Sequence, residues 1–365
     1  MFKNFYNNKR VLVTGHTGFK GSWLSLWLTQ LGAEVFGYAL APYTPDDHYN
    51  AIHLDDAVHS TLADIRNLEI LSKTITEIQP EIIFHLAAQP LVRASYLHPI
   101  ETYETNIMGT AYLLEAARQI PSLQAIIIIT TDKCYENVEQ QRGYVETDAL
   151  GGYDPYSSSK AGAELVTAAY RRSFFNQKTG GHPALVASAR AGNVIGGGDW
   201  CKDRIMTDSI RSLMNNQPIQ VRNPRAVRPW QHVLEPVSGY LWLGTQVAKS
   251  DLFSGAWNFG PQTDRLFPVS EVADHVIKSW GGGQWVDVSD PHALHEAGLL
   301  HLDCTKSRGK LQWEGLLTIP KSIDMTVKWY KHFSANPTSN MRDFSERQLS
   351  EYISIATKKN IRWSK

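Results

Sequence analysis

A tyrosine and a lysine lie four residues apart in the segment 153–170, YDPYSSSKAGAELVTAAY. On a helix, this spacing places Tyr156 and Lys160 on one face. An ammonium beside a phenol favours the phenolate and lowers the phenol's pKa, which normally lies near about 10. We therefore expect Tyr156 to act as a general acid and base, with Lys160 as its activating partner.

A second polar group directly follows the apolar run 124–131, QAIIIITT. Ligands of parallel α/β sheets bind beyond the carboxyl ends of the strands. If the run is a strand, Thr131, Asp132 and Lys133 lie at the rim of an active site. The alternative is a solvated pair of charges in a surface loop.

Three glycines at spacing three separate a β-branched run, 10–14, from an apolar helical pattern, 19–31. Gly15 permits a tight turn, Gly18 lets the backbone approach a pyrophosphate, and Gly21 lets the helix lie close to the strand. The unpaired N–H groups of a helix N-terminus attract phosphate. This stretch therefore predicts a dinucleotide site, whereas a purely structural turn is the alternative.

Strands and helices alternate through the first half of the chain. After the glycine turn, we expect strands at 34–40, 58–64, 81–88, 124–131 and 183–191, with helices at 67–79 and within 99–120. This order predicts an α/β fold with a Rossmann-type doubly wound parallel sheet. The second strand ends without the acid that holds the ribose of NAD or an arginine that holds the phosphate of NADP, so the residues leave that choice open.

The pattern changes after residue 190, and we expect a smaller C-terminal substrate-binding lobe. Helices near 203–216 and 235–248 alternate with short strands at 219–222, 227–233 and 256–260. The predicted division is 1–190 for the dinucleotide-binding domain, 191–335 for the lobe and 336–365 for a tail with a helix at 341–355. Later segments around 227–260 could join the main sheet.

The composition excludes several classes of function. Lys plus Arg and Asp plus Glu both total 36, so a broad nucleic-acid surface is not expected. Cys134, Cys201 and Cys304 have neither the spacing of a metal site nor that of a disulfide framework. No apolar run approaches the roughly 18 residues of a membrane span, and the first residues lack an apolar signal segment. We therefore expect a cytoplasmic protein with no metal and no membrane partner.

Together these motifs resemble the extended short-chain dehydrogenase/reductases that act on nucleotide sugars. The resemblance covers about residues 9–330. It rests on the glycine turn at Gly15, Gly18 and Gly21, on Asp64-Ile65, Leu86-Ala87-Ala88, Asn106 with Gly109-Thr110, Tyr156 with Lys160, and Arg190 with Asn193-Val194.

Within this family, the chain is similar to the sugar nucleotide 4,6-dehydratases, and most similar to those that act on CDP-glucose. The similar stretches are GHTGFKGSW at 15–23, TTDKCYEN at 130–137, RAGNVIGGGDW at 190–200 and RPWQHVLEP at 228–236. The resemblance implies NAD as the cofactor and a place in 3,6-dideoxyhexose synthesis for bacterial surface polysaccharides. It also implies a homodimer formed by helices near 102–119 and 156–174, to which Tyr112, Leu113, Ala116, Tyr170 and Phe174 would lend apolar surface. Core positions are the alternative for these five side chains.

The resemblance also implies the roles of individual residues. The cofactor site would comprise Gly15, His16, Gly18, Phe19, Gly21, Asp64, Ile65, Leu86, Ala87, Tyr156 and Lys160. Tyr156 would take the proton of the sugar 4-hydroxyl, Thr131 would bind the 4-oxygen, and Asp132 would protonate the leaving 6-hydroxyl. Asn193, Arg204 and Arg228 are the candidates for binding the sugar and its phosphates, because an arginine fork matches phosphate geometry; surface arginines are the alternative.

Two residues leave their roles open. Lys133 replaces the glutamate that better-known dehydratases carry after the aspartate, so it either takes the C5 proton as a neutral amine or reaches the cofactor. His16 either contacts the cofactor or is a solvent-facing turn residue.

Three other activities share most of the motifs. They are a nucleotide-sugar 4-epimerase, which would not need Asp132, a 4,6-dehydratase for another nucleotide sugar, and a non-catalytic dinucleotide sensor.

Overall fold

The fold is organised around a seven-stranded parallel sheet, seen in a computed structural model that describes residues 1–261, 267–290, 298–336 and 339–365. The strand order is β11-β6-β5-β4-β1-β2-β3, which is that of a doubly wound sheet. The strands are β1 (Arg10–Thr14), β2 (Glu34–Ala39), β3 (His59–Leu62), β4 (Ile82–His85), β5 (Ala125–Ile129), β6 (Leu185–Ala191) and β11 (Gly255–Phe259). The predicted fold class is therefore confirmed.

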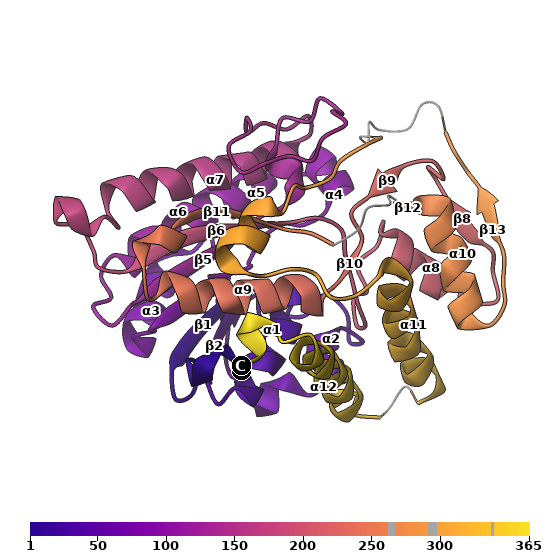
Figure 1. The fold of residues 1–365 in the computed structure, drawn as a ribbon, viewed down its shortest axis with the longest axis horizontal. Coiled ribbons are helices and arrows are strands. Elements are labelled where there is room, and N and C mark those ends of the chain that lie inside the picture. Colours follow the sequence, from indigo (N-terminus) through magenta and orange to yellow (C-terminus); the bar gives the residue numbers. More distant parts are fainter. Residues whose placement is uncertain (262–266, 291–297, 337–338) are drawn as a thin grey trace.

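Alternate residues of the strands enter two separate cores, because successive side chains of a strand point to opposite faces. Val11 and Ile127 join the larger cluster, whereas Leu12 and Ile126 join the smaller one. The first face is covered by α1 (Phe19–Gln30) and α9 (Leu234–Val247), and the second by α3 (Leu68–Ile78), α6 (Gly109–Ala117) and α7 (Pro155–Ser173). Figure 1 shows these three layers.

The first half of the chain also contains shorter helical elements near the carboxyl edge of the sheet. These are α2 (His48–Ala51), α4 (Val92–Leu97), α5 (Pro99–Tyr103), a π-helical turn η3 (Glu104–Met108) and a 3-10 turn η4 (Asp132–Cys134). Leu113 and Ala116 are buried in the core between α3, α6 and the sheet, so the core alternative holds for these two residues.

A smaller lobe lies beside the sheet (Figure 1). Its helices are α8 (Ile205–Met214), α10 (Val269–Trp280) and α11 (Ile319–Ala335), and its paired strands are β7 (Val194–Ile195) with β10 (Gln231–His232), β8 (Ile219–Val221) with β13 (Trp285–Asp287), and β9 (Val227–Arg228) with β12 (Phe267–Pro268). The single strand expected at 227–233 is therefore wrong: β9 and β10 pair with different partners. Pro229 lies between them, and proline has no N–H to donate to a strand partner.

Residues 234–259 return to the main sheet, where α9 covers β5 and β6 and β11 extends the edge beside β6. The division into two domains and a tail remains a prediction. The tail contains α12 (Arg342–Lys358), which covers α1 from outside: Trp27 meets Tyr352 and Trp363 edge to face, and Trp363 stacks on Phe2. None of the described helices has the length and apolar composition needed to cross a membrane.

Candidate active site

Thr131 and Asp132 form a buried polar group where β5 ends. The Thr131 hydroxyl donates to Asp132 Oδ1 at 2.9 Å, and its oxygen accepts from the Lys133 N–H at 3.3 Å. Asp132 has no exposed surface, so the alternative of a solvated loop pair is wrong for this residue. Its Oδ2 is buried and has no hydrogen-bond partner among the described residues, and Lys133 Nζ lies 4.0 Å from Oδ1.

The first turn of α7 holds the tyrosine. Asp154 caps the helix by accepting from the Ser157 N–H and hydroxyl at 2.9 and 2.6 Å. The Tyr156 N–H donates to Ser95 Oγ on α4 at 3.1 Å, which fixes this turn of α7 against α4. Tyr156 also shares a hydrogen bond with Thr131, so the phenol lies beside the polar group at the end of β5.

The pKa of Tyr156 is raised rather than lowered, and the cause is burial. Burial raises the pKa of Tyr156 to about 12, and the hydrogen bond shared with Thr131 only partly offsets this. Burial also lowers the pKa of Lys160 to about 7, with a further contribution from the charge of Lys20. Lys160 Nζ donates to the Ile129 carbonyl at 3.4 Å. Burial therefore disfavours both the phenolate and the ammonium that would stabilise it.

The glycine turn is built by close backbone approach. Gly15 has φ +75°, and a Cβ there would lie 2.7 Å from the Ala87 nitrogen and 2.9 Å from the Leu86 carbonyl carbon. A Cβ on Gly21 would lie 2.0 Å from the Gly15 oxygen, so this helix can approach the turn only with glycine there. The turn thus joins the ends of β1 and β4, and it brings together Gly15, Leu86 and Ala87, three of the residues expected to bind the cofactor.

The N-terminus of α1 is open to a ligand. Its N-cap is Gly18, which offers no side-chain cap and is exposed. A Cβ on Gly18 would meet only the Gly15 oxygen, at 3.4 Å. The first N–H groups of the helix therefore face open space, which suits a pyrophosphate. Phe19 follows at the first position of the helix and points its ring at Gly196, where a Cβ would lie 3.0 Å away.

His16 is buried, so the solvent-facing alternative is wrong. Its ring covers Gly37 of β2, where a Cβ would lie 2.3 Å from the imidazole, and its Nε2 is 2.7 Å from Ser60 Oγ on β3. Burial lowers the pKa of His16 to about 4, so the ring is neutral near pH 7. Nδ1 has no partner among the described residues and lies beside the turn.

Asp64 and Ile65 follow β3 at the same edge. Arg66 donates to Asp64 Oδ2 through Nε and Nη2 at 3.0 and 2.6 Å, so the carboxylate is held by its neighbour, and this hydrogen bonding lowers the pKa of Asp64. Ile65 lies against Gly109, where a Cβ would be 2.9 Å from its Cγ2. These contacts fix the wall of the site beyond the glycine turn.

The predicted substrate residues occupy different positions. Asn193 follows β6, and its Oδ1 is buried without a partner in the described part of the chain. Arg204 precedes α8 and donates to Asp199 Oδ2 at 2.6 Å, and its charge lowers the pKa of Tyr156 slightly against the effect of burial. Arg228 on β9 is buried and donates to the Val227 and Gly298 carbonyls at 2.9 and 3.3 Å.

Sequence reasoning missed two charged residues of this site, Lys20 and Asp199. Lys20 is the second residue of α1, and its charge acts on Lys160, while Asp199 binds Arg204. A signal existed for Lys20, because it is the one basic residue within an otherwise apolar helical pattern. Asp199, in the loop 196–200, had no comparable signal, although its partner Arg204 follows only five residues later.

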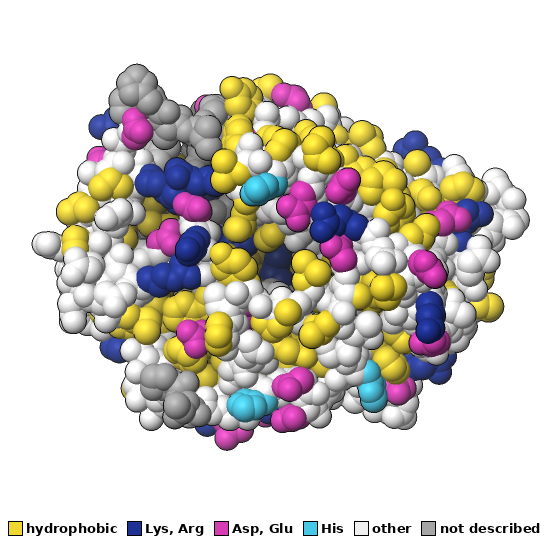
Figure 2. All heavy atoms as spheres, turned by 180° about the vertical axis from the view of Figure 1, so that it is seen from behind, with side chains coloured by type: hydrophobic (Ala, Val, Ile, Leu, Met, Phe, Trp, Pro, Cys, Tyr) yellow, Lys and Arg dark blue, Asp and Glu magenta, His cyan; other side chains and the backbone are white. Residues whose placement is uncertain are grey.

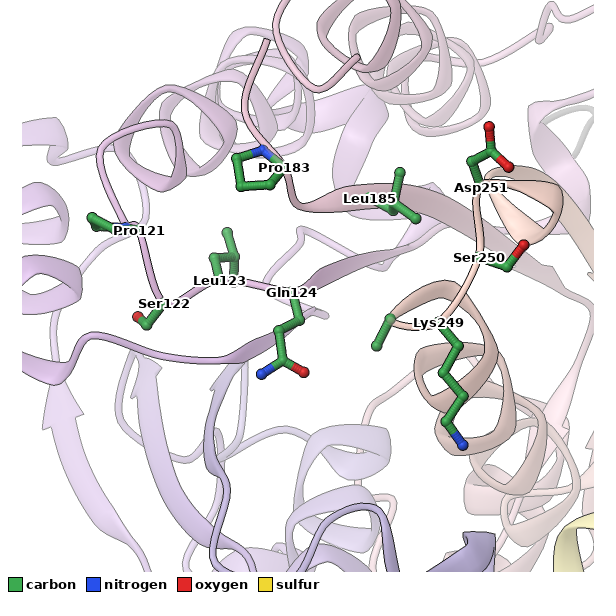
Figure 3. Close-up of a pocket in the computed structure, with 10 residues that line it drawn as sticks. Pro121, Ser122, Leu123, Gln124, Pro183, Leu185, Lys249, Ser250 and Asp251 are labelled. Carbon is green, nitrogen blue, oxygen red and sulfur yellow. The ribbon is translucent and has the colours of Figure 1, made fainter. Parts of the chain in front are cut away.

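Figure 2 shows a hollow near the middle of the face turned away in Figure 1, with a basic side chain at its floor. A different hollow, of about 730 Å³, lies at the amino ends of β5 and β6 and is shown in Figure 3. Leu123, Gln124, Leu185, Lys249 and Asp251 are among the residues that line it. Because parallel α/β sheets bind ligands at the carboxyl edge, this second hollow is not the candidate active site.

The arrangement at the carboxyl edge fits a dinucleotide. The uncapped N-terminus of α1 would hold its pyrophosphate, and the close contacts of Gly15 and Gly21 shape the floor beneath it. Thr131, Asp132 and Tyr156 form a buried acid–base group at the same edge of the sheet, where β5 ends two strands from β1. Such a group can move protons on a substrate while a bound dinucleotide exchanges hydride.

Comparison with known proteins shows which family has this fold and these motifs. The family model described as GDP-mannose 4,6 dehydratase matches residues 12–326. The chain is 48% identical over 359 residues to CDP-glucose 4,6-dehydratase from Salmonella typhimurium, covering 98% of this chain and 99% of that protein. The structure of DesIV, a dTDP-glucose 4,6-dehydratase from Streptomyces venezuelae with NAD bound, has a TM-score of 0.77 at 22% identity and covers 90% of this chain and all of that one. UDP-glucose 4-epimerase from Thermotoga maritima has a TM-score of 0.76 at 21% identity, with 88% and 99% covered.

Proposed function

This chain belongs to the GDP-mannose 4,6-dehydratase family, and we propose that it is an NAD-dependent sugar nucleotide 4,6-dehydratase that converts CDP-glucose to CDP-4-keto-6-deoxyglucose and water. The observation that carries the proposal is the buried group of Thr131, Asp132 and Tyr156 beside the glycine turn. The CDP-glucose dehydratase from Salmonella matches this chain over nearly its full length, which supports cytosine as the base of the nucleotide sugar. The product would enter 3,6-dideoxyhexose synthesis for surface polysaccharides.

The reaction is an internal oxidation and reduction. NAD, when bound, supplies the hydride acceptor at C4 and the hydride donor at C6. Tyr156 accepts the proton of the 4-hydroxyl, and Thr131, which already bonds Tyr156 and Asp132, binds the 4-oxygen. The 4-ketone makes the C5 proton acidic. Removal of that proton, and protonation of the leaving 6-hydroxyl by Asp132, release one water, and the proton returns to C5 when hydride reaches C6.

Several residues hold the reactants in place. Lys160 binds the ribose of the nicotinamide, and Asn193, Arg204 and Arg228 hold the sugar and its diphosphate. The remaining cofactor contacts are assigned to Gly15, His16, Gly18, Phe19, Gly21, Asp64, Ile65, Leu86 and Ala87. A homodimer is part of the proposal, supported by exposed Leu97, Ile100 and Leu165 on the helices of one edge. A cytoplasmic location follows from the class of reaction.

Product analysis tests the activity. Purified protein with NAD is incubated separately with CDP-, dTDP-, GDP- and UDP-glucose, and the molecular masses of the products are measured by mass spectrometry. Loss of one water from CDP-glucose alone, without net NADH, is the expected result. An unchanged mass with an altered sugar configuration would favour the 4-epimerase instead, and binding of NAD without any turnover would favour the sensor.

The base at C5 needs its own experiment, because Lys133 replaces the usual glutamate. Lys133 Nζ lies 4.0 Å from Asp132 Oδ1, and we assign it the C5 proton. Lys133→Ala is then expected to lower kcat about 10²-fold while NAD affinity changes little. Solvent-deuterium incorporation at C5 reports the same step. Weakened NAD binding with persistent turnover of the bound cofactor would instead make Lys133 a cofactor ligand.

A further inference from the structure

The loop between β7 and α8 contains a run of glycines, Gly196 to Gly198, which is followed by Asp199. The reaction above gives these residues no role. Glycine loses more conformational freedom on folding than any other residue, so an ordered run of glycines needs contacts that hold it. In this structure the contacts come from α1, α2 and α11, which are all distant from the loop in the sequence.

Successive carbonyl groups of the loop each accept a hydrogen bond from a different helix. The donors are Trp23 Nε1 on α1, the His48 N–H of α2 and the Tyr330 hydroxyl on α11, and they donate in that order to the carbonyls of residues 197, 198 and 199, at 3.0, 3.0 and 2.6 Å. All the donor residues are buried. Because water cannot compete for these bonds, they fix the backbone that carries the Asp199 side chain.

The loop also lies directly against the helix that begins at the glycine turn. Gly196 contacts Phe19, the first residue of α1, and Gly197 accepts from Trp23 one turn later. On its other side, Gly197 is covered by Trp329 of α11, whose Cγ would lie 2.0 Å from a Cβ at this position. The loop is therefore held between the lobe and the helix end that is assigned to the pyrophosphate.

This fixed backbone brings the Asp199 carboxylate to Arg204. Arg204 Nη1 donates to Asp199 Oδ2 at 2.6 Å, and Asp199 Oδ1 accepts from the Cys201 N–H at 3.2 Å. The Asp199 side chain is 5% exposed, whereas that of Arg204 is 30% exposed. The carboxylate is thus a buried anchor, while the guanidinium still reaches solvent. Within the described residues the guanidinium makes no other hydrogen bond, so its remaining N–H donors can bind an anion.

We propose that Asp199 is a positioning residue, which holds the Arg204 guanidinium in place for the diphosphate of the substrate. A mobile arginine side chain loses rotational freedom when it binds a ligand, and one that a buried carboxylate already holds loses less. The planar guanidinium can bind a carboxylate on one edge and a phosphate on another. The inference rests on the proposed function for the contact between Arg204 and the diphosphate, and it adds the residue that prepares this contact.

A double-mutant cycle measured by titration calorimetry tests this coupling. NAD-loaded protein is titrated with CDP, which cannot react. Asp199→Ala should weaken CDP binding about tenfold, and Arg204→Ala about thirtyfold. Because Asp199 acts through Arg204, the double variant should bind CDP within about twofold of Arg204→Ala alone. With CDP-glucose as substrate, Asp199→Ala should raise KM about tenfold while kcat changes less than about threefold.

Two further variants separate this role from a general effect on the lobe. Asp208→Ala is the matched control, because Asp208 pairs with Arg211 and Arg222 rather than with Arg204, and it should bind CDP like the unchanged protein. Asp199→Asn keeps an oxygen that can accept from Arg204 but loses the charge, so it should weaken CDP binding only about threefold. If Asp199→Ala does not fold, the cycle is run with Asp199→Asn.

Different results would overturn the proposal and the proposed function. The positioning role alone fails if Asp199→Ala binds CDP normally while Arg204→Ala binds it weakly. It also fails if Asp199→Ala causes the same loss with and without Arg204, which would leave Asp199 a structural role. Normal CDP binding in Arg204→Ala would instead remove Arg204 from the diphosphate site, and the role of Asp199 with it. If product analysis rejects CDP-glucose, the accepted nucleoside diphosphate replaces CDP, and coupling with that probe would support Asp199 even though the proposed substrate had failed.

Discussion

Two buried carboxylates lie near the end of β5 in opposite circumstances. Glu164 on α7 accepts from the Thr130 and Ser188 hydroxyls at 2.5 and 2.7 Å, and from Arg190 Nη2 at 2.9 Å. Burial alone would raise the pKa of Glu164, but Arg190 and these donors hold it below its usual value. Asp132, one turn of chain beyond β5, has one oxygen bonded by Thr131 and the other without a partner among the described residues.

The difference separates scaffold from site. A buried carboxylate whose hydrogen bonds are all supplied from within fixes the positions of β5, β6 and α7 and has nothing left to offer a ligand. A buried carboxylate with an unused oxygen costs stability, and such cost is retained where a reaction uses the group. Substitutions in the Glu164 region should therefore change the free energy of unfolding, and those around Asp132 should change turnover.

Removing the cation from the satisfied region should give the largest effect. Arg190→Met leaves Glu164 buried without its counter-ion, and loss of one partner of a buried pair costs about 3–5 kcal/mol. Urea or thermal unfolding should show this loss. The double variant Glu164→Leu with Arg190→Met should recover part of it. An unfolding midpoint for Arg190→Met equal to that of the unchanged protein would contradict the structural role assigned to the Glu164 region.

Asp132→Asn should affect turnover rather than folding. The amide keeps the shape but cannot deliver the proton to the 6-oxygen, so kcat should fall about 10²–10⁴-fold. The thermal midpoint should stay near that of the unchanged protein. Normal turnover in this variant would favour the 4-epimerase, which does not eliminate water.

A third buried carboxyl, Glu235 on α9, sharpens the contrast because amides rather than a cation hold it. Oε1 accepts from the Leu316 and Leu317 N–H groups at 2.8 and 2.6 Å, and Oε2 accepts from the Tyr352 hydroxyl at 2.8 Å. Burial raises its pKa from 4.5 to about 7. The stability contributed by this group is therefore present below pH 4.5 and is lost as pH rises through 7, by at most about 3 kcal/mol.

Glu235→Gln cannot titrate, so it should unfold like the unchanged protein near pH 5 and be the more stable of the two at pH 8.5. Unfolding midpoints across this range measure the difference. Glu77→Gln, at an exposed position on α3, is the matched control. A constant gap between Glu235→Gln and the unchanged protein at all pH values would contradict the assignment.

Arg228→Ala should give the smallest effect. If Arg228 holds only the diphosphate, KM should rise about tenfold while kcat changes less than threefold. Steady-state kinetics with CDP-glucose separate the two constants. An unchanged KM would remove Arg228 from the site and leave it a role in packing between β9 and Gly298.

The sequence predicted what depends on local patterns. The β-branched runs, the glycine spacing and the Tyr156–Lys160 interval are local, and they sufficed for the sheet and for the candidate site. The raised pKa of Tyr156 depends on burial, which a local pattern does not show. The electrostatic effect of Asp132 on Lys20 joins two segments that are more than a hundred residues apart in the sequence. The break between β9 and β10 could have been predicted from Pro229. The roles of the site residues remain predictions.

The covering of α1 by the tail has a consequence during protein synthesis. Trp27 lies on α1, but its aromatic neighbours Tyr352 and Trp363 are made more than 300 residues later. At about 5–20 residues per second, the indole waits tens of seconds for that cover. Newly made chains therefore expose the apolar face of α1, to which chaperones can bind. Messages cut short before codon 352 should yield aggregated protein rather than a smaller active protein.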